Sequence, residues 1–357
     1  MPDPAVPSMN TAYIRRGQRA NYLILLTVYG NVRKGLGRVI AIIASIVPLI
    51  LISLFLHVGV EDILSIGLFP FIVSCLIALA KLFIQGLRFH YYVRSFIGDG
   101  VAKMSSNVQI RMGSEFVTLT TPAYTGGEWV RVAWLYKNGV HSGKGLWIIT
   151  IEIISDVLVG STLAYIAMII AFGAHNYVVS TAILVITTPV FVSYLILLTL
   201  SAKKTLQMPR FTRPLLTRLF GIEKGERWTN VMNDSLRVLC ETSRMYLKRS
   251  SLRIFAVGLA LTFVGAALHA LTFMIVASAK ASIGFFESLV MVAAAISIGT
   301  IPISPGGSGL TELGIAYYLN TFNIDPAAFG DVIIVWRIAS YHVPLFVSWA
   351  LLVRSLR

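Results

Sequence analysis

Long apolar runs constrain this chain more than any other feature of its sequence. A helix needs roughly twenty residues to cross about 30 Å of hydrocarbon. Six runs meet this requirement, at 39–58, 66–92, 146–172, 178–200, 254–279 and 332–353. Hydrophobic residues make up 56% of the chain and charged residues only 13%. The sequence therefore predicts an all-α polytopic membrane protein with about six full spans.

Two further apolar regions, 105–136 and 285–319, contain breaks that prevent them from being ordinary spans. The first reads TPAYTGGEWVR over 121–131, and the second reads SPGGSGLTELG over 304–314. Proline removes a helix donor, and each glycine costs about 1 kcal/mol relative to alanine in a helix. Broken backbone at membrane depth is tolerated only where it is buried in protein or lines a wet cavity. We therefore expect two re-entrant helical hairpins.

Basic residues set the expected orientation, because Lys and Arg in short loops near span ends stay cytoplasmic. The loop 201–253 holds twelve Lys or Arg, and segment 1–38 holds six, whereas the short loop 174–176 has none. Both termini and the basic loop are therefore predicted to be cytoplasmic. With this topology the two hairpins enter the membrane from opposite faces.

The arrangement of span, hairpin and span at 66–172 then returns in the opposite orientation at 254–353. Inverted repeats with interrupted helices are typical of transporters that alternate access to a central site. The expected organisation is a cytoplasmic tail and surface helix at 1–38, a first membrane half at 39–200, a basic cytoplasmic loop at 201–253, and a second membrane half at 254–357.

The charges beside the two breaks are the candidate site. A helix that restarts after a glycine-rich break presents unpaired N–H groups and a positive dipole end, which suits a phosphate. Arg111, Arg131 and Arg337 can hold a phosphate through bidentate contacts. Glu128 and Glu312 could pair with these arginines, receive a cationic headgroup or carry a coupling proton. Intramembrane charges mark function by default, and the alternative is a set of ion pairs that only holds the broken helices together.

Other charges inside the apolar runs extend this site. Glu152 and Asp156 lie four residues apart on one helix face, so they repel each other unless a cation, an arginine or a proton lies between them. Lys81 could extend to the interface, and Arg88 could bind a headgroup. The predicted substrate-binding residues are Arg111, Pro122, Gly126, Gly127, Glu128, Arg131, Glu152, Asp156, Pro305, Gly306, Gly307, Ser308, Gly309, Glu312 and Arg337. If both hairpins reach one cavity, the charges of the first should lie near those of the second.

Two stretches around the breaks, EFVTLTTPAYTGGEWVRVAWL and ISIGTIPISPGGSGLTELGIAYYL, carry a family resemblance. They resemble the paired signatures of the flippase-like membrane family that includes the transmembrane part of lysylphosphatidylglycerol synthase, the multiple peptide resistance factor. The resemblance implies a module that translocates a membrane lipid, either a phospholipid or a polyprenyl-linked headgroup. The chain ends at Arg357, just past a span, so we expect no aminoacyl-transferase domain and no enzyme activity.

The expected location is the cell membrane of a prokaryote. The candidate protein partners are a second copy of the chain and a separate lipid-modifying enzyme. The net charge of +14 lies in the tail and loops, where attraction to anionic headgroups explains it. We therefore expect no nucleic-acid partner.

No cofactor or metal is expected. Cys75 and Cys240 lie far apart in the sequence and suggest neither a disulfide framework nor a metal site. The sequence contains no GxxxxGK[ST] stretch, so nothing indicates ATP binding. A transporter of this kind would depend on an ion gradient, on the lipid gradient or on simple equilibration.

Two alternative functions stay open at this point. Residues 306–309 spell GxSG, the nucleophile motif of rhomboid intramembrane proteases. Ser308 with His269 or His342 as its base would form a catalytic dyad. The second alternative is a membrane scaffold or partner subunit that transports nothing.

Overall fold

The computed structural model describes residues 47, 50, 51, 53, 54, 58–122, 124–209, 211–247 and 251–355. The predicted surface helix within 1–38 lies outside these residues, and so does most of the predicted first span at 39–58. Apart from one isolated bridge, the described residues form helices and no strands. The chain is an all-α polytopic membrane protein.

The first membrane half and the basic loop contribute eight described helices: α3 (Val60–Ser65), α4 (Leu68–Phe96), α5 (Met104–Thr120), α6 (Gly127–Lys137), α7 (Ser142–Gly173), α8 (Tyr177–Lys203), α9 (Thr212–Phe220) and α10 (Ile222–Tyr246). The second half contributes α11 (Leu252–Ala277), α12 (Phe285–Gly299), α13 (Leu310–Leu319), the 3₁₀ turns η2 (Asn320–Phe322) and η3 (Ala327–Phe329), α14 (Gly330–Arg337), the π-helix η4 (Ile338–His342) and α15 (Val343–Ser355).

Among the described residues, five helical segments are long and apolar enough to cross a membrane. Four of them are α4, α7, α8 and α11, and the fifth is the continuous segment Ala327–Ser355 that includes α14, η4 and α15. Each coincides with one of the predicted runs. Five of the six predicted spans are therefore matched by described helices, and the sixth is the run at 39–58.

The two predicted helix breaks are confirmed. Helix α5 ends at Thr120, two residues before Pro122, and α6 begins at Gly127. Helix α12 ends at Gly299, and α13 begins only at Leu310. The residue that precedes each new helix, Gly126 or Gly309, has a positive φ of 108° or 92°. Glycine adopts this backbone conformation without the steric cost that a side chain brings.

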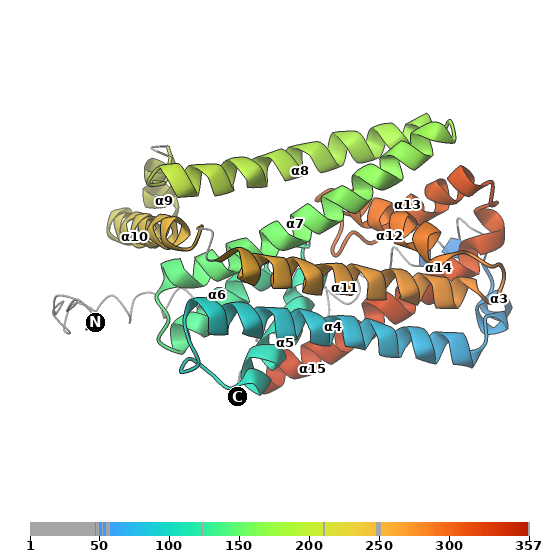
Figure 1. Cartoon of the computed structure of the whole chain (residues 1–357), viewed down its shortest axis with the longest axis horizontal. Coiled ribbons are helices and arrows are strands. Elements are labelled where there is room, and N and C mark those ends of the chain that lie inside the picture. The colour runs from blue at the N-terminus through green and yellow to red at the C-terminus, as the bar shows by residue number, and fades with distance from the viewer. Residues whose placement is uncertain are drawn as a thin grey trace.

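The two helix pairs lie at opposite ends of the bundle (Figure 1). In this view α5 and α6 lie toward the end that carries α9 and α10, whereas α12 and α13 lie toward the end that carries α3. Helix α5 packs along α15, and α4 packs along α11. Within each pair the two helices pack against each other, α5 against α6 and α12 against α13.

Two apolar cores correspond to these two ends. One core surrounds α12 and α13 and includes Met291, Ile315 and Trp336. The other surrounds α5 and α6 and includes Phe89, Trp147 and Tyr341. The two helix breaks lie close together. Gly306, in the break before α13, lies against the Leu119 carbonyl oxygen and the Tyr341 ring, and both of these residues belong to the core around α5 and α6.

Candidate functional site

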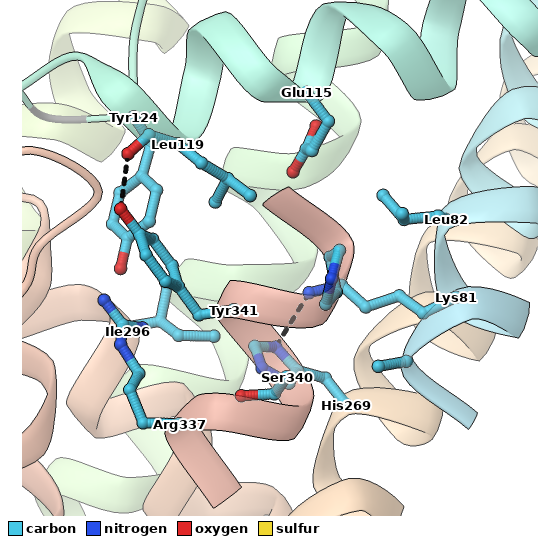
Figure 2. A pocket seen from close by; sticks show the side chains of 12 residues that line it. Lys81, Leu82, Glu115, Leu119, Tyr124, His269, Ile296, Arg337, Ser340 and Tyr341 are labelled. Atoms are coloured by element: carbon cyan, nitrogen blue, oxygen red, sulfur yellow. Dashed lines mark hydrogen bonds between the residues drawn. The ribbon is translucent and has the colours of Figure 1, made fainter. Parts of the chain in front are cut away.

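The two helix breaks touch each other near the middle of the molecule. Pro122 and Pro305 form an isolated antiparallel bridge, in which the backbone N–H of Gly306 donates to the carbonyl oxygen of Thr121 at 3.1 Å. The hydroxyl of Tyr341 donates to the Leu119 carbonyl oxygen at 2.7 Å (Figure 2). Residues nearly two hundred positions apart in the sequence therefore share one junction.

Gly306 can occupy this junction only because it lacks a side chain. Its φ is +52°, in the left-handed region that favours glycine. A Cβ atom here would lie 2.5 Å from the Leu119 carbonyl oxygen and would collide with the Tyr341 ring. The second glycine-rich motif is thus required by a close backbone approach to the first unit.

The first unit consists of α5, the break at 121–126 and α6. A network of buried charges surrounds this unit, and Glu152 of α7 lies at the centre of the network. Its carboxylate lies 3.2 Å from the Arg88 guanidinium, 2.8 Å from Arg111 and 3.3 Å from Arg131. Arg131 also lies 3.6 Å from Glu128. Three helices besides α7 therefore supply an arginine to one carboxylate.

The predicted repulsion between Glu152 and Asp156 is resolved by Arg88. Its guanidinium contacts Asp156 at 2.5 and 2.9 Å and reaches Glu152 with its second terminal nitrogen. On the far side of the network, Arg111 donates to Glu115 at 2.6 Å. This arrangement satisfies buried charges that would otherwise be costly.

In the second unit, which consists of α12, the break at 300–309 and α13, Glu312 forms an ion pair with Arg337 of the last span. The Arg337 guanidinium lies 2.8 Å from Glu312 and donates to the Gly306 carbonyl oxygen at 2.7 Å. The guanidinium carbon also lies 4.0 Å from the centre of the Tyr341 ring, a cation–π distance. Arg337 therefore ties the last span to the junction of the two breaks.

Both glutamates of the motifs cap the helix that follows the break. Glu128 accepts from the Gly126 N–H at 2.6 Å, and Glu312 accepts from the Gly309 N–H at 2.8 Å. A carboxylate at this position is favoured by the positive end of the helix dipole. The predicted phosphate site at each helix start thus already holds a carboxylate of the protein itself.

A cavity of about 120 Å³ lies beside the junction. Its polar lining consists of Lys81, Glu115, Tyr124, His269, Arg337, Ser340 and Tyr341 (Figure 2). These side chains come from α4, α5, the first break, α11 and the last span. Groups from both membrane halves therefore face one space.

Lys81 has an unusual environment in this cavity. Its Nζ lies 2.9 Å from His269 Nδ1. A lysine in its protonated form can only donate, and with that form the imidazole accepts at Nδ1. The imidazole in turn stacks against Trp336, with ring centres 5.7 Å apart. Within the described part of the chain, no carboxylate lies within 4.0 Å of Lys81, which distinguishes it from the motif arginines.

The structure divides the predicted site residues into two groups. The first group, around Glu152, consists of Arg111, Pro122, Gly126, Gly127, Glu128, Arg131, Glu152 and Asp156, and the second consists of Pro305, Gly306, Gly307, Ser308, Gly309, Glu312 and Arg337. The backbones of the two groups meet at the junction, but among the described residues no ion pair joins a charged side chain of one group to a charged side chain of the other. Of all these residues, Arg337 alone lines the cavity described above.

The sequence analysis expected Lys81 to extend to the membrane interface and did not single out Glu115, whereas the structure places both on the cavity wall. Glu115 follows Arg111 by four residues, and this helical spacing could have joined it to the predicted site. Lys81 lies in the middle of an apolar run, where a charge signals function. No local signal joins Lys81 to Arg337, because only the packing of α4 against the last span does so.

The alternative of a protease dyad requires a hydrogen bond between Ser308 and a histidine. Ser308 lies 3.4 Å from Arg337, and no hydrogen bond joins it to a histidine within the described residues. His269 is engaged with Lys81. His342 lies 3.4 Å from the Arg337 carbonyl oxygen.

Fold and site together define an all-helical membrane protein with two broken-helix units that meet over a polar cavity. The family described as the lysylphosphatidylglycerol synthase TM region matches residues 22–348, and the chain belongs to this family. It is also similar to a UPF0104 membrane protein of Archaeoglobus fulgidus, with 26% identity over 242 residues, which cover 67% of this chain and 73% of the relative.

Proposed function

We propose that the protein is a lipid transporter that moves a phosphate-bearing headgroup between the two leaflets by way of the cavity at the junction. The observation that carries this proposal is Lys81. Its Nζ faces the cavity, lies 2.9 Å from Nδ1 of His269 and, among the described residues, has no carboxylate within 4.0 Å. Such a cation is available to an anionic ligand.

The energetic requirement of the task agrees with this geometry. A charged group at the centre of the bilayer costs about 2.5–3.5 kcal/mol in an inserted helix, so a transported phosphate needs replacement partners. Lys81 offers a countercharge, and Tyr124 and Ser340 offer hydroxyl groups on the same lining. The motif arginines, in contrast, are already neutralised by carboxylates of the protein.

The size of the cavity limits what it can enclose. Its volume of about 120 Å³ is below the roughly 300–1,000 Å³ of sites that enclose drug-sized ligands. It suits a phosphate group and its neighbouring atoms. The acyl or prenyl chains would stay in the surrounding lipid during transport.

The membrane topology is part of the same proposal. The two helix pairs are re-entrant hairpins from opposite faces, related as an inverted repeat, and the end that carries α9 and α10 is cytoplasmic. Supporting this, α5–α6 and α12–α13 lie toward opposite ends of the bundle (Figure 1). Opposed broken helices around one site are the arrangement that alternating access requires.

A reconstituted transport assay tests the proposal. Purified protein in vesicles should accelerate the bleaching by dithionite of an inner-leaflet phospholipid labelled on its acyl chain. Lys81→Met should reduce the rate at least several-fold, whereas Lys144→Met, which removes an exposed lysine of α7, should leave it unchanged. Equal rates with and without the wild-type protein would contradict the proposal.

One observation favours a second candidate, a scaffold without transport. The motif charges pair with one another, and both motif glutamates cap helices, so the repeated motif also explains how the broken helices are held. In that case Lys81→Met would change no lipid movement, because none would be catalysed. The vesicle assay therefore separates the two candidates.

A further inference from the structure

Two basic side chains of the cavity lie in direct contact. Lys81 Nζ lies 2.9 Å from His269 Nδ1 (Figure 2). We infer that this pair is a proton site: it takes up one proton when an anionic headgroup binds in the cavity and releases that proton when the headgroup leaves. This inference rests on the proposed function, and it adds a proton as the second species that the protein carries.

The contact between the two side chains holds at most one positive charge. A hydrogen bond needs an acceptor, and a protonated lysine has only donors. An imidazolium likewise donates from both nitrogens and accepts at neither. If both groups were charged, two cations would face each other at 2.9 Å without a hydrogen bond, and like charges resist this. One of the two basic groups is therefore uncharged while they touch.

With one positive charge on this pair, the charges around the cavity already balance. Within the described part of the chain, the charged groups of the cavity wall and of the ion pairs behind it are Lys81, Arg88, Arg111, Arg131 and Arg337 against Glu115, Glu128, Glu152, Asp156 and Glu312. A monoanionic headgroup therefore adds a negative charge that these groups do not neutralise. The uptake of one proton restores the balance.

The imidazole is held in place, whereas the lysine side chain can move. His269 stacks against Trp336 with ring centres 5.7 Å apart, and the indole N–H of Trp336 donates to the Thr272 hydroxyl at 2.9 Å. Lys81 has a flexible four-carbon stem, and no described carboxylate lies within 4.0 Å of its Nζ. An anion in the cavity can therefore draw the lysine ammonium away from Nδ1.

Once Lys81 contacts the anion, Nδ1 of His269 is free to bind a proton from the solvent. One N–H bond forms, the imidazole becomes a cation beside the bound phosphate, and no other bond is made or broken. Each of the two ligands, the anion and the proton, then raises the affinity for the other. When the headgroup leaves, Lys81 returns to the imidazole and the proton is released. Headgroup and proton thus cross together, and their joint movement carries no net charge.

The other titratable groups around the pair come from several elements. Arginine stays charged in proteins, and a phenol is already protonated near neutral pH, so neither takes up a further proton. Among the described residues of the lining, Glu115 is the one carboxylate, which makes it the alternative acceptor. The groups concerned are Glu115 of α5, Tyr124 of the first break, Arg337 of α14 and Tyr341 of η4, while Asp156 of α7 also acts on Lys81 and α12 adds only the apolar Ile296.

Calorimetric titration tests the inference. The full-length protein in a non-ionic detergent is titrated near neutral pH with dioctanoyl phosphatidylglycerol, in buffers that differ in ionisation enthalpy. The dependence of the heat on the buffer gives the number of protons taken up per lipid bound, and we expect about one. Because the complex holds one proton more than the free protein, the lipid should bind about tenfold more weakly for each unit by which the pH rises. Dioctanoylglycerol, which lacks the phosphate, should cause no uptake.

Variants locate the proton. His269→Gln should reduce the uptake to about zero, whereas His175→Gln, a matched change at an exposed histidine of the loop between α7 and α8, should leave it unchanged. Uptake that persists in His269→Gln would overturn the inference. If that variant does not fold, Glu115→Gln decides: it should still take up about one proton, and loss of the uptake there would place the proton on Glu115 instead.

The outcomes separate this inference from the proposed function. A wild type that moves phospholipid in vesicles but binds the lipid without proton uptake, or with an affinity that does not change with pH, refutes this inference alone. A wild type that neither binds the lipid nor moves it in vesicles refutes both.

Discussion

The two broken-helix units carry the same motif but hold their charges differently. In the first unit, Arg131 lies three residues after Glu128 on the same helix and also contacts Glu152. In the second unit, Glu312 has one arginine, Arg337, which comes from the last span. The first unit therefore shares its charges across a network, whereas the second depends on a single pair inside an apolar core.

This difference indicates where the fold is vulnerable. When one carboxylate of a shared network is lost, its arginine keeps another partner. When the single carboxylate of an isolated buried pair is lost, the arginine stays buried without compensation, which is the more costly case. Substitutions in the two units should therefore differ in how much stability they cost.

The largest effect is expected for Glu312→Gln. Arg337 is 3% exposed, and the substitution removes its carboxylate partner. We expect the free energy of unfolding to fall by about 3–5 kcal/mol, measured by unfolding with sodium dodecyl sulfate in mixed micelles. The double variant Glu312→Gln/Arg337→Gln should lose less than the sum of the two single losses. Strict additivity would show that the two residues do not act as a pair.

A somewhat smaller loss is expected for Gly306→Ala. The new Cβ would meet the Leu119 carbonyl oxygen and the Tyr341 ring at a positive φ. Backbone strain and overpacking together should reduce the unfolding free energy by about 2–4 kcal/mol. Gly173→Ala is the matched control, because a Cβ there meets nothing within 4 Å. Equal stability of the two variants would argue against a tight junction between the units.

The counterpart substitution in the first unit, Glu128→Gln, should have a small effect. The Glu128 side chain is 23% exposed and lies 3.6 Å from Arg131, which keeps Glu152 as a second partner. We expect a loss of about 1 kcal/mol or less in the same unfolding experiment. A loss as large as that of Glu312→Gln would remove the contrast between the units.

The smallest effect is expected for Ser308→Ala. The hydroxyl lies 3.4 Å from Arg337, at the limit of a hydrogen bond, so stability should change by about 1 kcal/mol or less. Lipid movement in vesicles should stay near the wild-type rate. Loss of activity, together with covalent labelling of Ser308 by a fluorophosphonate, would favour the protease instead.

Much of the architecture could be predicted from the sequence, because its causes are local. Apolar runs of sufficient length give the five described membrane-crossing segments. Pro122 and Gly126 break one helix, and Pro305 with the glycines after it breaks the other. The spacing of Glu152 and Asp156 also required a cation, an arginine or a proton between the two carboxylates. The structure identifies it as Arg88.

Only the tertiary structure decided which groups form the cavity. Lys81, Glu115 and His269 lie on three different helices, and no spacing along the chain relates them to Arg337. Their proximity results from the packing of α4 against α11 and from the contact between the two breaks. The sequence alone determined where helices form and break, since propensity and apolar length act over short distances. Which charges remain unpaired depends on contacts between distant helices, and these arise only when the chain packs.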